Sequence, residues 1–389
     1  MQPLQSEPLH LYVHIPFCAH KCHYCDFNSH EREAPDWQGY GESLIEELQN
    51  WARTPQFQGR SISSIFFGGG TPSLAPPSLI DSVINSASEN FRLAADTEIT
   101  LEANPGTVDA DHFQGYRQAG VNRLSIGVQS LRDEELRWLE RIHHADQAIN
   151  AYEIARATGF ENINLDLMYG LPDQLLPTWL GTLHQAMALE PEHLSCYQLT
   201  VEPHTRLAAS HARKPYSMPD EELALSFFTE TRRHLLDGGY EAYEVSNFSR
   251  PGRQCRHNDG YWLYHDYVGI GAGAAGKWDT TDGGIIRYSN IRTPERYMSA
   301  VIREGRAVSS REALNLHEAS AEAVWLGLRR REGIDRRAYQ RRFAEDPWDR
   351  FVAKLEPWHG QGQLDVDERS VCLNEKGLPL TDAIAASVL

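Results

Sequence analysis

The stretch "YVHIPFCAHKCHYCDF" at residues 12–27 begins as a short apolar run and leads directly into closely spaced cysteines. Cys18, Cys22 and Cys25 follow with the spacing C-x3-C-x2-C, and they are three of the six cysteines in this 389-residue chain. Three thiols are too few to close a four-ligand structural zinc site, and they cannot all pair as disulfides. The stretch therefore predicts a strand followed by a loop that binds a metal or a metal cluster.

The composition is acidic and supplies ample apolar residues for a core. Hydrophobic residues make up 41% of the chain, and the formal net charge is -17. This charge argues against a nucleic acid or an anionic membrane surface as partner, because both need a basic face. No run approaches a membrane span, and the N-terminus lacks the pattern of a signal peptide, so we expect a cytoplasmic protein. In that reducing compartment, clustered cysteines indicate metal or redox chemistry.

Six strand-like runs, each followed by a helical pattern, occupy the chain from residue 10 to about residue 200. The predicted strands are 10–15, 61–67, 98–103, 123–129, 162–168 and 193–199. Consecutive βα units imply a parallel sheet with right-handed crossovers, and six units are fewer than the eight of a closed barrel. We predict an α/β fold with an incomplete (β/α)6 barrel, although the pattern alone also allows a flat doubly wound sheet.

The βα rhythm ends near residue 200, and the chain divides into three predicted parts. Residues 1–205 form the barrel with its cysteine loop, residues 206–305 form an extension, and residues 306–389 form a small α+β C-terminal domain. The extension should contain a helix at 221–240, a strand at 240–248 and a Gly-rich segment. The C-terminal part should be helical with a short β-hairpin.

Residues suited to ligand binding lie at the carboxyl ends of the predicted strands, where sites form in parallel α/β sheets. "GGGTPS" (68–73) follows the second strand, Glu102 ends the third, and Gln129 ends the fourth. Asp166 lies in the fifth strand, and Arg141 lies on the helical stretch after the fourth. We therefore predict that these residues and the cysteine loop share one mouth.

The cysteine loop has two interpretations. Closely spaced thiolates can bind three irons of an iron–sulfur cube, which leaves the fourth iron open to a small molecule. The alternative is a zinc site completed by one of the nearby histidines, which are His10, His14, His20, His23 and His30. Zinc loops usually combine C-x2-C with a distant second pair, and this sequence has no such pair. The spacing therefore favours the cluster.

The C-x3-C-x-aromatic-C pattern after a first strand, with a Gly-rich run after the second, resembles the radical S-adenosylmethionine (SAM) family. Further phrases resemble its HemN/HemW branch, which contains oxygen-independent coproporphyrinogen dehydrogenases and heme chaperones. They are "YVHIPFC" (12–18), "FFGGGTPS" (66–73), "EANPGT" (102–107), "NRLSIGVQS" (122–130), "NLDLMYGLP" (164–172), "YEVSNF" (243–248) and "EKGLPLTD" (375–382). The resemblance therefore covers nearly the whole chain.

This resemblance implies a [4Fe-4S] cluster whose open iron binds SAM. The implied cluster ligands are Cys18, Cys22 and Cys25. The implied SAM-binding residues are Tyr12, Tyr24, Gly69, Gly70, Thr71, Glu102, Gln129, Arg141 and Asp166, with Thr200 as a further candidate. Carboxylates suit the ribose hydroxyls and the ammonium group, and the planar guanidinium suits the carboxylate of SAM. Taken singly, Asp166 could also be a cap, Arg141 a surface charge and Gln129 a buried polar residue of the sheet.

Three features resemble the heme chaperones more than the dehydrogenases. Phe27 stands where the dehydrogenases carry an extra cysteine, and the first strand begins about ten residues into the chain, which leaves no room for their N-terminal lid. "CRHNDGYW" (255–262) resembles the heme-binding motif H-N-x-x-Y-W. The resemblance implies that His257 provides an axial nitrogen to heme iron and that Tyr261 and Trp262 stack on the macrocycle.

The chain departs from the branch at two positions near this motif. Asp259 replaces the usual leucine, and Ala275 replaces a histidine of the "GIGAGAAG" phrase (269–276). His257 could instead be a hydrogen-bonded histidine of a loop, and Cys255 could bind heme, form a thioether or do neither. "GAGAAGK" (271–277) is not a phosphate-binding loop, because Trp278 occupies the position that requires serine or threonine.

Two functions follow from the resemblance. The first is a heme chaperone that transfers heme to an acceptor protein, of which a membrane-associated respiratory heme protein is an example, and that needs an electron donor for its cluster. The alternative is a radical SAM enzyme that acts on a porphyrinogen or a similar substrate. Coproporphyrinogen dehydrogenase activity itself is not expected, because of Phe27 and the absent lid.

Overall fold

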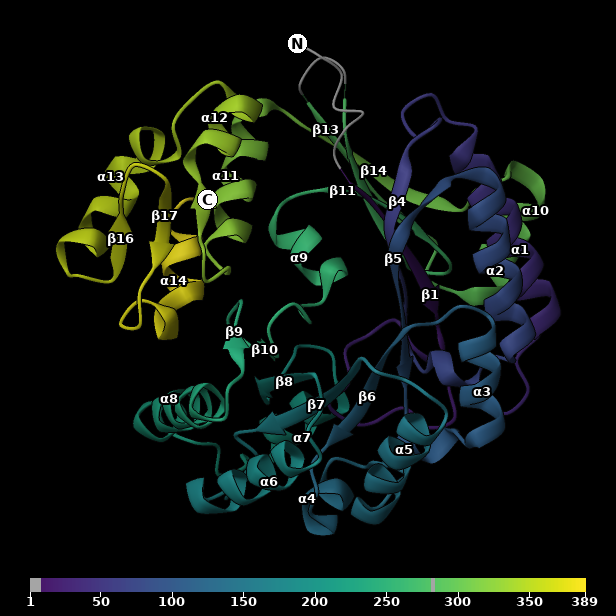
Figure 1. Ribbon diagram of the computed structural model, residues 1–389, viewed down its shortest axis with the longest axis horizontal. Coiled ribbons are helices and arrows are strands. Elements are labelled where there is room, and N and C mark those ends of the chain that lie inside the picture. The colour runs from purple at the N-terminus through teal and green to yellow at the C-terminus, as the bar shows by residue number, and fades with distance from the viewer. Residues whose placement is uncertain (1–7, 281–283) are drawn as a thin grey trace.

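The computed structural model describes residues 8–280 and 284–389, and a large open sheet dominates it (Figure 1). Its strand order is β14-β13-β12-β11-β1-β4-β5-β6-β7-β8-β10-β9. The six βα strands are parallel and pair in chain order, which confirms the predicted barrel core. They are β1 (Leu9–Ile15), β4 (Ser61–Gly69), β5 (Arg92–Ala103), β6 (Arg123–Gln129), β7 (Ile163–Tyr169) and β8 (His193–Gln198). Because β9 and β14 lie at the two edges, the barrel is incomplete, as predicted.

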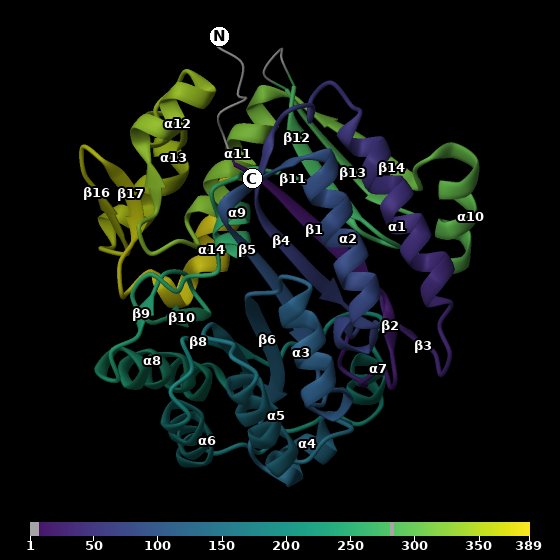
Figure 2. The same cartoon turned by 45° about the vertical axis from the view of Figure 1, so that its right-hand side comes forward.

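Helices between these strands cover the outer face of the sheet (Figures 1 and 2). They are α1 (Trp37–Ala52), α2 (Pro77–Asn90), α3 (Ala110–Gln118), α4 (Asp133–Trp138), α5 (Ala145–Ala157) and α6 (Leu176–Ala188), with short 3-10 turns η1 (Pro72–Leu74) and η2 (Pro105–Thr107). Side-chain caps begin several of them. The carboxylates of Asp36 and Asp109 accept backbone N–H groups in the first turns of α1 and α3, which would otherwise lack partners.

Alternation along the strands makes the inner face of the barrel polar. In β1, Leu11 and Val13 are fully buried in the main hydrophobic core, whereas His10, Tyr12 and His14 occupy the intervening positions. Successive side chains of a strand point to opposite faces, so the same parity repeats across the sheet. The outer face therefore supplies the core beneath the helices, and the inner face is free to hold polar groups and ligands.

Segments that follow the barrel extend the sheet at both edges. The strand β11 (Asp266–Ile270) pairs in parallel with β1, and antiparallel strands continue outward from it. The added strands are β12 (Ala275–Asp279), β13 (Ile285–Asn290) and β14 (Val308–Leu314) at one edge, and β9 (Glu241–Ala242) and β10 (Asn247–Ser249) at the other. The remaining elements of this part are β2 (Phe17–Cys18), β3 (His30–Glu31), α7 (Arg206–Arg213), α8 (Glu221–Asp237), α9 (Arg256–Trp262) and α10 (Pro294–Glu304).

The single strand predicted at 240–248 is wrong, because the chain forms two short antiparallel strands there, β9 and β10. The buried carboxylate of Glu244 explains the break. Its Oε1 accepts the backbone N–H of Ser246 and the amide N–H of Asn247, both at 2.7 Å. Such local side-chain hydrogen bonds compete with a strand ladder and favour a turn.

The C-terminal part forms its own small core and contains the predicted helices and hairpin (Figure 1). Its elements are α11 (Leu316–Gly327), β15 (Ile334–Asp335), α12 (Arg336–Phe343), α13 (Pro347–Gly360), β16 (Leu364–Val366), β17 (Ser370–Leu373), η3 (Leu378–Leu380) and α14 (Thr381–Ala386). The hairpin joins β16 to β17, and β15 adds a third strand. Within the described ranges, no helix is both long and apolar enough to cross a membrane.

Candidate iron–sulfur and SAM site

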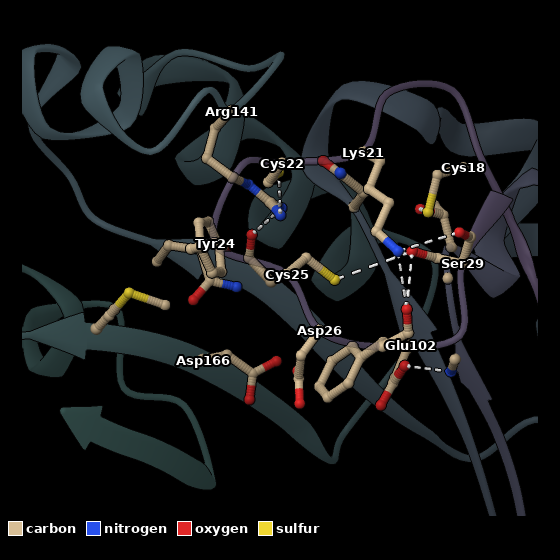
Figure 3. Close-up of a pocket in the computed structure, with 18 of the residues that line it drawn as sticks. Cys18, Lys21, Cys22, Tyr24, Cys25, Asp26, Ser29, Glu102, Arg141 and Asp166 are labelled. Carbon is tan, nitrogen blue, oxygen red and sulfur yellow. Dashed lines mark hydrogen bonds between the residues drawn. The ribbon is translucent and has the colours of Figure 1, made fainter. Parts of the chain in front are cut away.

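A cavity of about 450 Å³ opens at the carboxyl ends of the barrel strands (Figure 3). It is lined by nearly all of the cluster and SAM residues that the sequence analysis predicted to lie at one site. These are Cys18, Cys22, Tyr24, Cys25, Gly69, Gly70, Thr71, Glu102, Gln129, Arg141, Asp166 and Thr200. Tyr12 is the exception among the predicted SAM residues, because it lines a neighbouring cavity instead.

Strand pairing at its two ends and hydrogen bonds from Lys21 hold the cysteine loop in place. The short strands β2 and β3 pair at its two ends, with Phe17 opposite His30. The ammonium group of Lys21 donates to the carbonyl oxygens of Phe27 and Ser29, at 3.0 and 3.2 Å. Within residues 8–280 and 284–389, no three His, Cys, Asp and Glu side chains form a ready site for a single metal ion.

Polar donors surround the sulfur atoms. The hydroxyl of Thr71 donates to Sγ of Cys18 at 3.4 Å, and the guanidinium of Arg141 donates to Sγ of Cys22 at 3.8 Å. Burial raises the pKa of the Cys18 and Cys25 thiols, so these thiols are protonated in the protein without a metal. Metal binding releases thiol protons, and the nearby donors then favour the thiolates. The donor set fits a cluster.

Arg141 lies in the loop between α4 and α5, and the prediction that it lies on a helix is wrong. Helix α4 ends early because Glu140 adopts a left-handed conformation with φ +54°, and the N–H of Arg141 then bonds to the carbonyl oxygen of Leu136 at 2.9 Å. The guanidinium also donates to the carbonyl oxygen of Gly127 at 2.8 Å, while its buried Nε has no partner within the described residues. An unused buried donor beside the thiols fits a carboxylate ligand.

Gly69 and Gly70 bring the backbone close to the cysteine loop. Gly69 has φ +121°, and a Cβ atom there would lie 2.6 Å from the ring of His14. The N–H of Gly70 bonds to the carbonyl oxygen of Ile15 at 2.8 Å. Only glycine fits such an approach, so the Gly-rich run places an unobstructed backbone edge at the cavity.

Two half-buried carboxyl groups face the cavity. Glu102 accepts the N–H of Gly69 at 3.1 Å, and burial together with the charge of Asp166 raises its pKa to about 8. Asp166 accepts hydrogen bonds from Asn164 at 2.8 Å and from Ser125 at 3.1 Å, and burial raises its pKa as well. A cationic or hydroxyl-bearing ligand would relieve this unfavourable pairing of like charges.

A second cavity of about 490 Å³ adjoins the first. Phe27, Gly69 and Glu102 line both cavities, and the side chain of Phe27 is 62% exposed. Tyr12 and Ala275 also line the second cavity, the latter at the position where the resemblance implies a histidine. The aromatic ring of Phe27 therefore marks the boundary between the two spaces.

The sequence motif 255–262 forms helix α9 together with its N-cap residue Cys255, and only part of it reaches a cavity. Tyr261 lines the second cavity, whereas His257 and Trp262 line neither cavity. His257 is 1% exposed, and its Nδ1 and Nε2 lie 2.7 Å from Oγ of Ser64 and 3.0 Å from Oη of Tyr261. The indole of Trp262 lies beneath the guanidinium of Arg329 instead.

The unexpected charge of Asp259 points away from both cavities. Its carboxylate pairs with Arg330, which follows α11, and Nε of Arg330 lies 2.7 Å from Oδ1 of Asp259. The side chains of this pair are 26% and 14% exposed, respectively. The aspartate therefore joins α9 to the C-terminal part and lines neither cavity.

Sequence reasoning missed several cavity residues. Ser125, Gly127 and Tyr197 line the first cavity, and the hydroxyl of Tyr197 donates to Oε1 of Gln129. The available signal was strand parity, because Ser125 and Gly127 share the inner face of β6 with Gln129. Lys21 and Arg292, in contrast, lie on loops and carry no such signal.

The chain is similar to known proteins over all of these regions. Residues 12–186 match the Radical SAM superfamily, and residues 314–380 match the HemN C-terminal domain. The heme chaperone HemW of Escherichia coli (strain K12) is 46% identical over 293 residues, which cover 75% of this chain and 76% of that protein. Radical S-adenosyl methionine domain-containing protein 1, mitochondrial, of Bos taurus is 36% identical over 390 residues, covering 99% and 88% of the two chains.

A solved structure shows the same fold over the full length. Coproporphyrinogen III oxidase (HemN) from Escherichia coli, a radical SAM enzyme, superposes with a TM-score of 0.84 at 28% identity, covering 100% of this chain and 91% of that chain. Radical SAM proteins use a [4Fe-4S] cluster and SAM, and the donor set of the first cavity fits both. The chain therefore belongs to the HemW family of radical SAM proteins.

Proposed function

We propose that this protein is a heme chaperone, which binds heme and transfers it to an acceptor protein, and that its cluster cavity holds a [4Fe-4S] cluster with SAM. One observation carries the proposal: the three-thiol cavity adjoins a second ligand-sized cavity that Tyr261 of the heme-binding motif lines. The relatives at 46% and 43% identity, both named heme chaperone HemW, support it. The cytoplasmic location expected from the sequence belongs to the same proposal.

The residues of the first cavity have separate roles in this proposal. The thiols of Cys18, Cys22 and Cys25 hold three irons, and the backbone at Gly69, Gly70 and Thr71 takes the ammonium end of SAM. Arg141 pairs with the SAM carboxylate through its unused donor, and Glu102 and Asp166 accept the hydroxyl and ammonium hydrogens. Tyr24 and Gln129 complete the wall. The cluster with SAM supplies one-electron chemistry.

An anaerobic heme titration of the cluster-reconstituted protein, with SAM present, tests the function. We expect a saturable change in the heme absorption bands that ends near one heme per chain. Transfer is then measured by adding an apo-heme protein and following the appearance of its holo spectrum. The absence of saturable heme binding would refute the chaperone function. Tight heme binding without transfer to the apo-heme protein would show that the protein binds heme but does not deliver it.

The full-length match to HemN, at 28% identity, favours one alternative function, that of a radical SAM enzyme acting on a porphyrinogen or a similar substrate. This alternative predicts that a porphyrinogen stimulates the formation of 5′-deoxyadenosine from SAM under reducing conditions. The chaperone predicts no stimulation, because Phe27 stands between the cavities and the extra cysteine of the dehydrogenases is missing. Chromatographic analysis of the nucleoside products distinguishes the two. The acceptor protein and the electron donor for the cluster belong to the same proposal.

A further inference from the structure

The ammonium group of Lys21 crosses the cysteine loop and lies beside the thiols (Figure 3). Lys21 directly precedes Cys22 and lines the first cavity. Its Nζ donates to the carbonyl oxygens of Phe27 and Ser29 on the opposite side of the loop, at 3.0 and 3.2 Å. Its backbone N–H bonds to Oε2 of Glu31 at 3.2 Å, so the main chain is held as well. The loop itself therefore fixes the position of this cation.

No carboxylate balances the charge of Lys21 within residues 8–280 and 284–389. Both acceptors of its ammonium group are neutral carbonyl oxygens, and the third N–H has no acceptor among these residues. An ammonium group has three donors, so one is left for water or for a ligand of the cavity. The positive charge therefore stays available to whatever the thiols bind.

Two other cations near the thiols have partners of their own. Nη2 of Arg206 lies 2.7 Å from Oε2 of Glu140, with which it forms an ion pair. The guanidinium of Arg141 donates to Sγ of Cys22, and the proposed function assigns its unused donor to the carboxylate of SAM. Once SAM is bound, Lys21 is the cation of this set that has no counter-charge.

A fixed positive charge beside the thiols favours the more negative state of a bound cluster. Burial raises the pKa of the Cys25 thiol, and the charge of Lys21 opposes this rise, so the ammonium group acts on that sulfur. Reduction adds one electron to a cluster that three thiolates already make negative, and the potential of such clusters depends on charge and nearby donors. Because Lys21 is half-buried, solvent and salt screen its charge incompletely.

We infer that Lys21 raises the reduction potential of the cluster and thereby limits the reductive cleavage of SAM. This inference rests on the [4Fe-4S] cluster and SAM of the proposed function, and it gives a role to a residue outside their ligand set. A cluster with a higher potential is a weaker reductant once it is reduced. Lys21 is thus a positioning residue that holds a charge in place, and it favours the use of SAM as a ligand over its use as a source of radicals.

The cleavage that Lys21 limits is a one-electron step. The electron comes from an external reductant, for which dithionite serves in the test, and it reaches the sulfonium sulfur of SAM through the cluster. The bond between C5′ and sulfur then breaks, which leaves methionine and a 5′-deoxyadenosyl radical. Transfer of a hydrogen atom from the buffer or the protein to this radical gives 5′-deoxyadenosine, which can be measured.

Two substitutions separate the charge of Lys21 from its hydrogen bonds. Lys21→Gln keeps N–H donors but removes the charge, whereas Lys21→Arg keeps both. In a redox titration of the reconstituted proteins followed by electron paramagnetic resonance, Lys21→Gln should lower the equilibrium constant for reduction about tenfold, which is about 59 mV for one electron. Lys21→Arg should stay near the wild type. Lys214→Gln is the matched control, because this exposed lysine follows α7 and lines neither cavity.

The nucleoside product gives a second readout. With dithionite in excess, Lys21→Gln should form 5′-deoxyadenosine faster than wild type, and Lys21→Arg should not. Equal potentials in wild type and Lys21→Gln, each with a full cluster by iron analysis, would overturn the inference. Loss of the cluster from Lys21→Gln would also overturn it, because Lys21 would then act in assembly instead of redox control. If the wild-type protein itself takes up no cluster, the proposed function fails instead.

Discussion

Gly70 lies so close to Cys18 that a Cβ atom on the glycine would come within 3.0 Å of Sγ of Cys18 and 2.7 Å of the carbonyl oxygen of Phe17. The glycine therefore leaves the space that the cysteine loop occupies. A Cβ atom at this position would meet the backbone of Phe17, which cannot move aside as easily as the end of a flexible side chain.

We predict that Gly70→Ala displaces Cys18 and lowers the iron and sulfide content per chain after reconstitution. Gly181→Ala is the control, because this exposed glycine of α6 has open space around its Cβ position and alanine favours a helix by about 1 kcal/mol. Iron analysis and the cluster absorption measure the outcome. A full cluster in Gly70→Ala would show that the loop accommodates the added Cβ atom without displacing Cys18.

Cys22→Ser should abolish the stable [4Fe-4S] cluster, because an alcohol is a poor substitute for a thiolate ligand. Cys372→Ser, in β17 of the C-terminal part, should leave the iron content unchanged. Iron, sulfide and visible absorption are measured after anaerobic reconstitution. Retention of the full cluster in Cys22→Ser would remove this residue from the ligand set.

Glu102 should make the ligand-free protein less stable as the pH rises. Its folded-state pKa is raised from 4.5 to about 8, so the folded protein keeps a proton that the unfolded chain releases. The free energy of unfolding then falls between about pH 4.5 and pH 8, by at most about 1.4 kcal/mol per pH unit, and levels off above that range. Urea unfolding across this range should show a steeper decline for wild type than for Glu102→Gln, which cannot titrate. Parallel curves would contradict the shifted pKa.

The ion pair between Asp259 and Arg330 should stabilise the contact between α9 and the C-terminal part. It is partly buried and uses two nitrogen–oxygen contacts, of 2.7 and 3.4 Å, so we expect a coupling energy of about 1 kcal/mol in a double-mutant cycle with alanine. The exposed pair Arg303–Glu304 is the control and should show almost no coupling. Asp259→Leu should leave heme affinity within about twofold of wild type, because Asp259 lines neither cavity. A twofold change in affinity corresponds to less than about 0.5 kcal/mol. A large loss of heme affinity would place the aspartate at the heme.

The parallel core was predictable because each strand carries an apolar run bounded by turn residues. The prediction for β6 (Arg123–Gln129) matches the structure at both ends. The strand β5 (Arg92–Ala103) begins six residues before the predicted 98, because its first residues pair with β4 across a register shift that the polar sequence does not signal. Local pattern therefore identified the strands but not their irregular ends.

The cysteine and glycine motifs could be placed at one site from sequence, whereas the orientation of His257 could not. Cys18, Cys22, Cys25 and the Gly-rich run share a cavity because strand ends in a parallel sheet meet at one edge, which sequence order already implies. The burial of His257 depends on Ser64, His10 and Glu98, which come from three strands far away in the sequence. No local signal reports such tertiary partners, so the motif could be located but not oriented.

The pairing of β1 with β11 has a consequence for how the protein matures in the cell. One edge of the strand that leads into the cysteine loop pairs with residues 266–270, and Asn28 of that loop donates to the carbonyl oxygens of Ala272 and Arg292. During synthesis the three cysteines leave the ribosome long before these partners exist, and contacts so distant in sequence form slowly. Cluster insertion is therefore expected to be a post-translational event, and the nascent chain must keep its thiols reduced and unoccupied until its second half arrives.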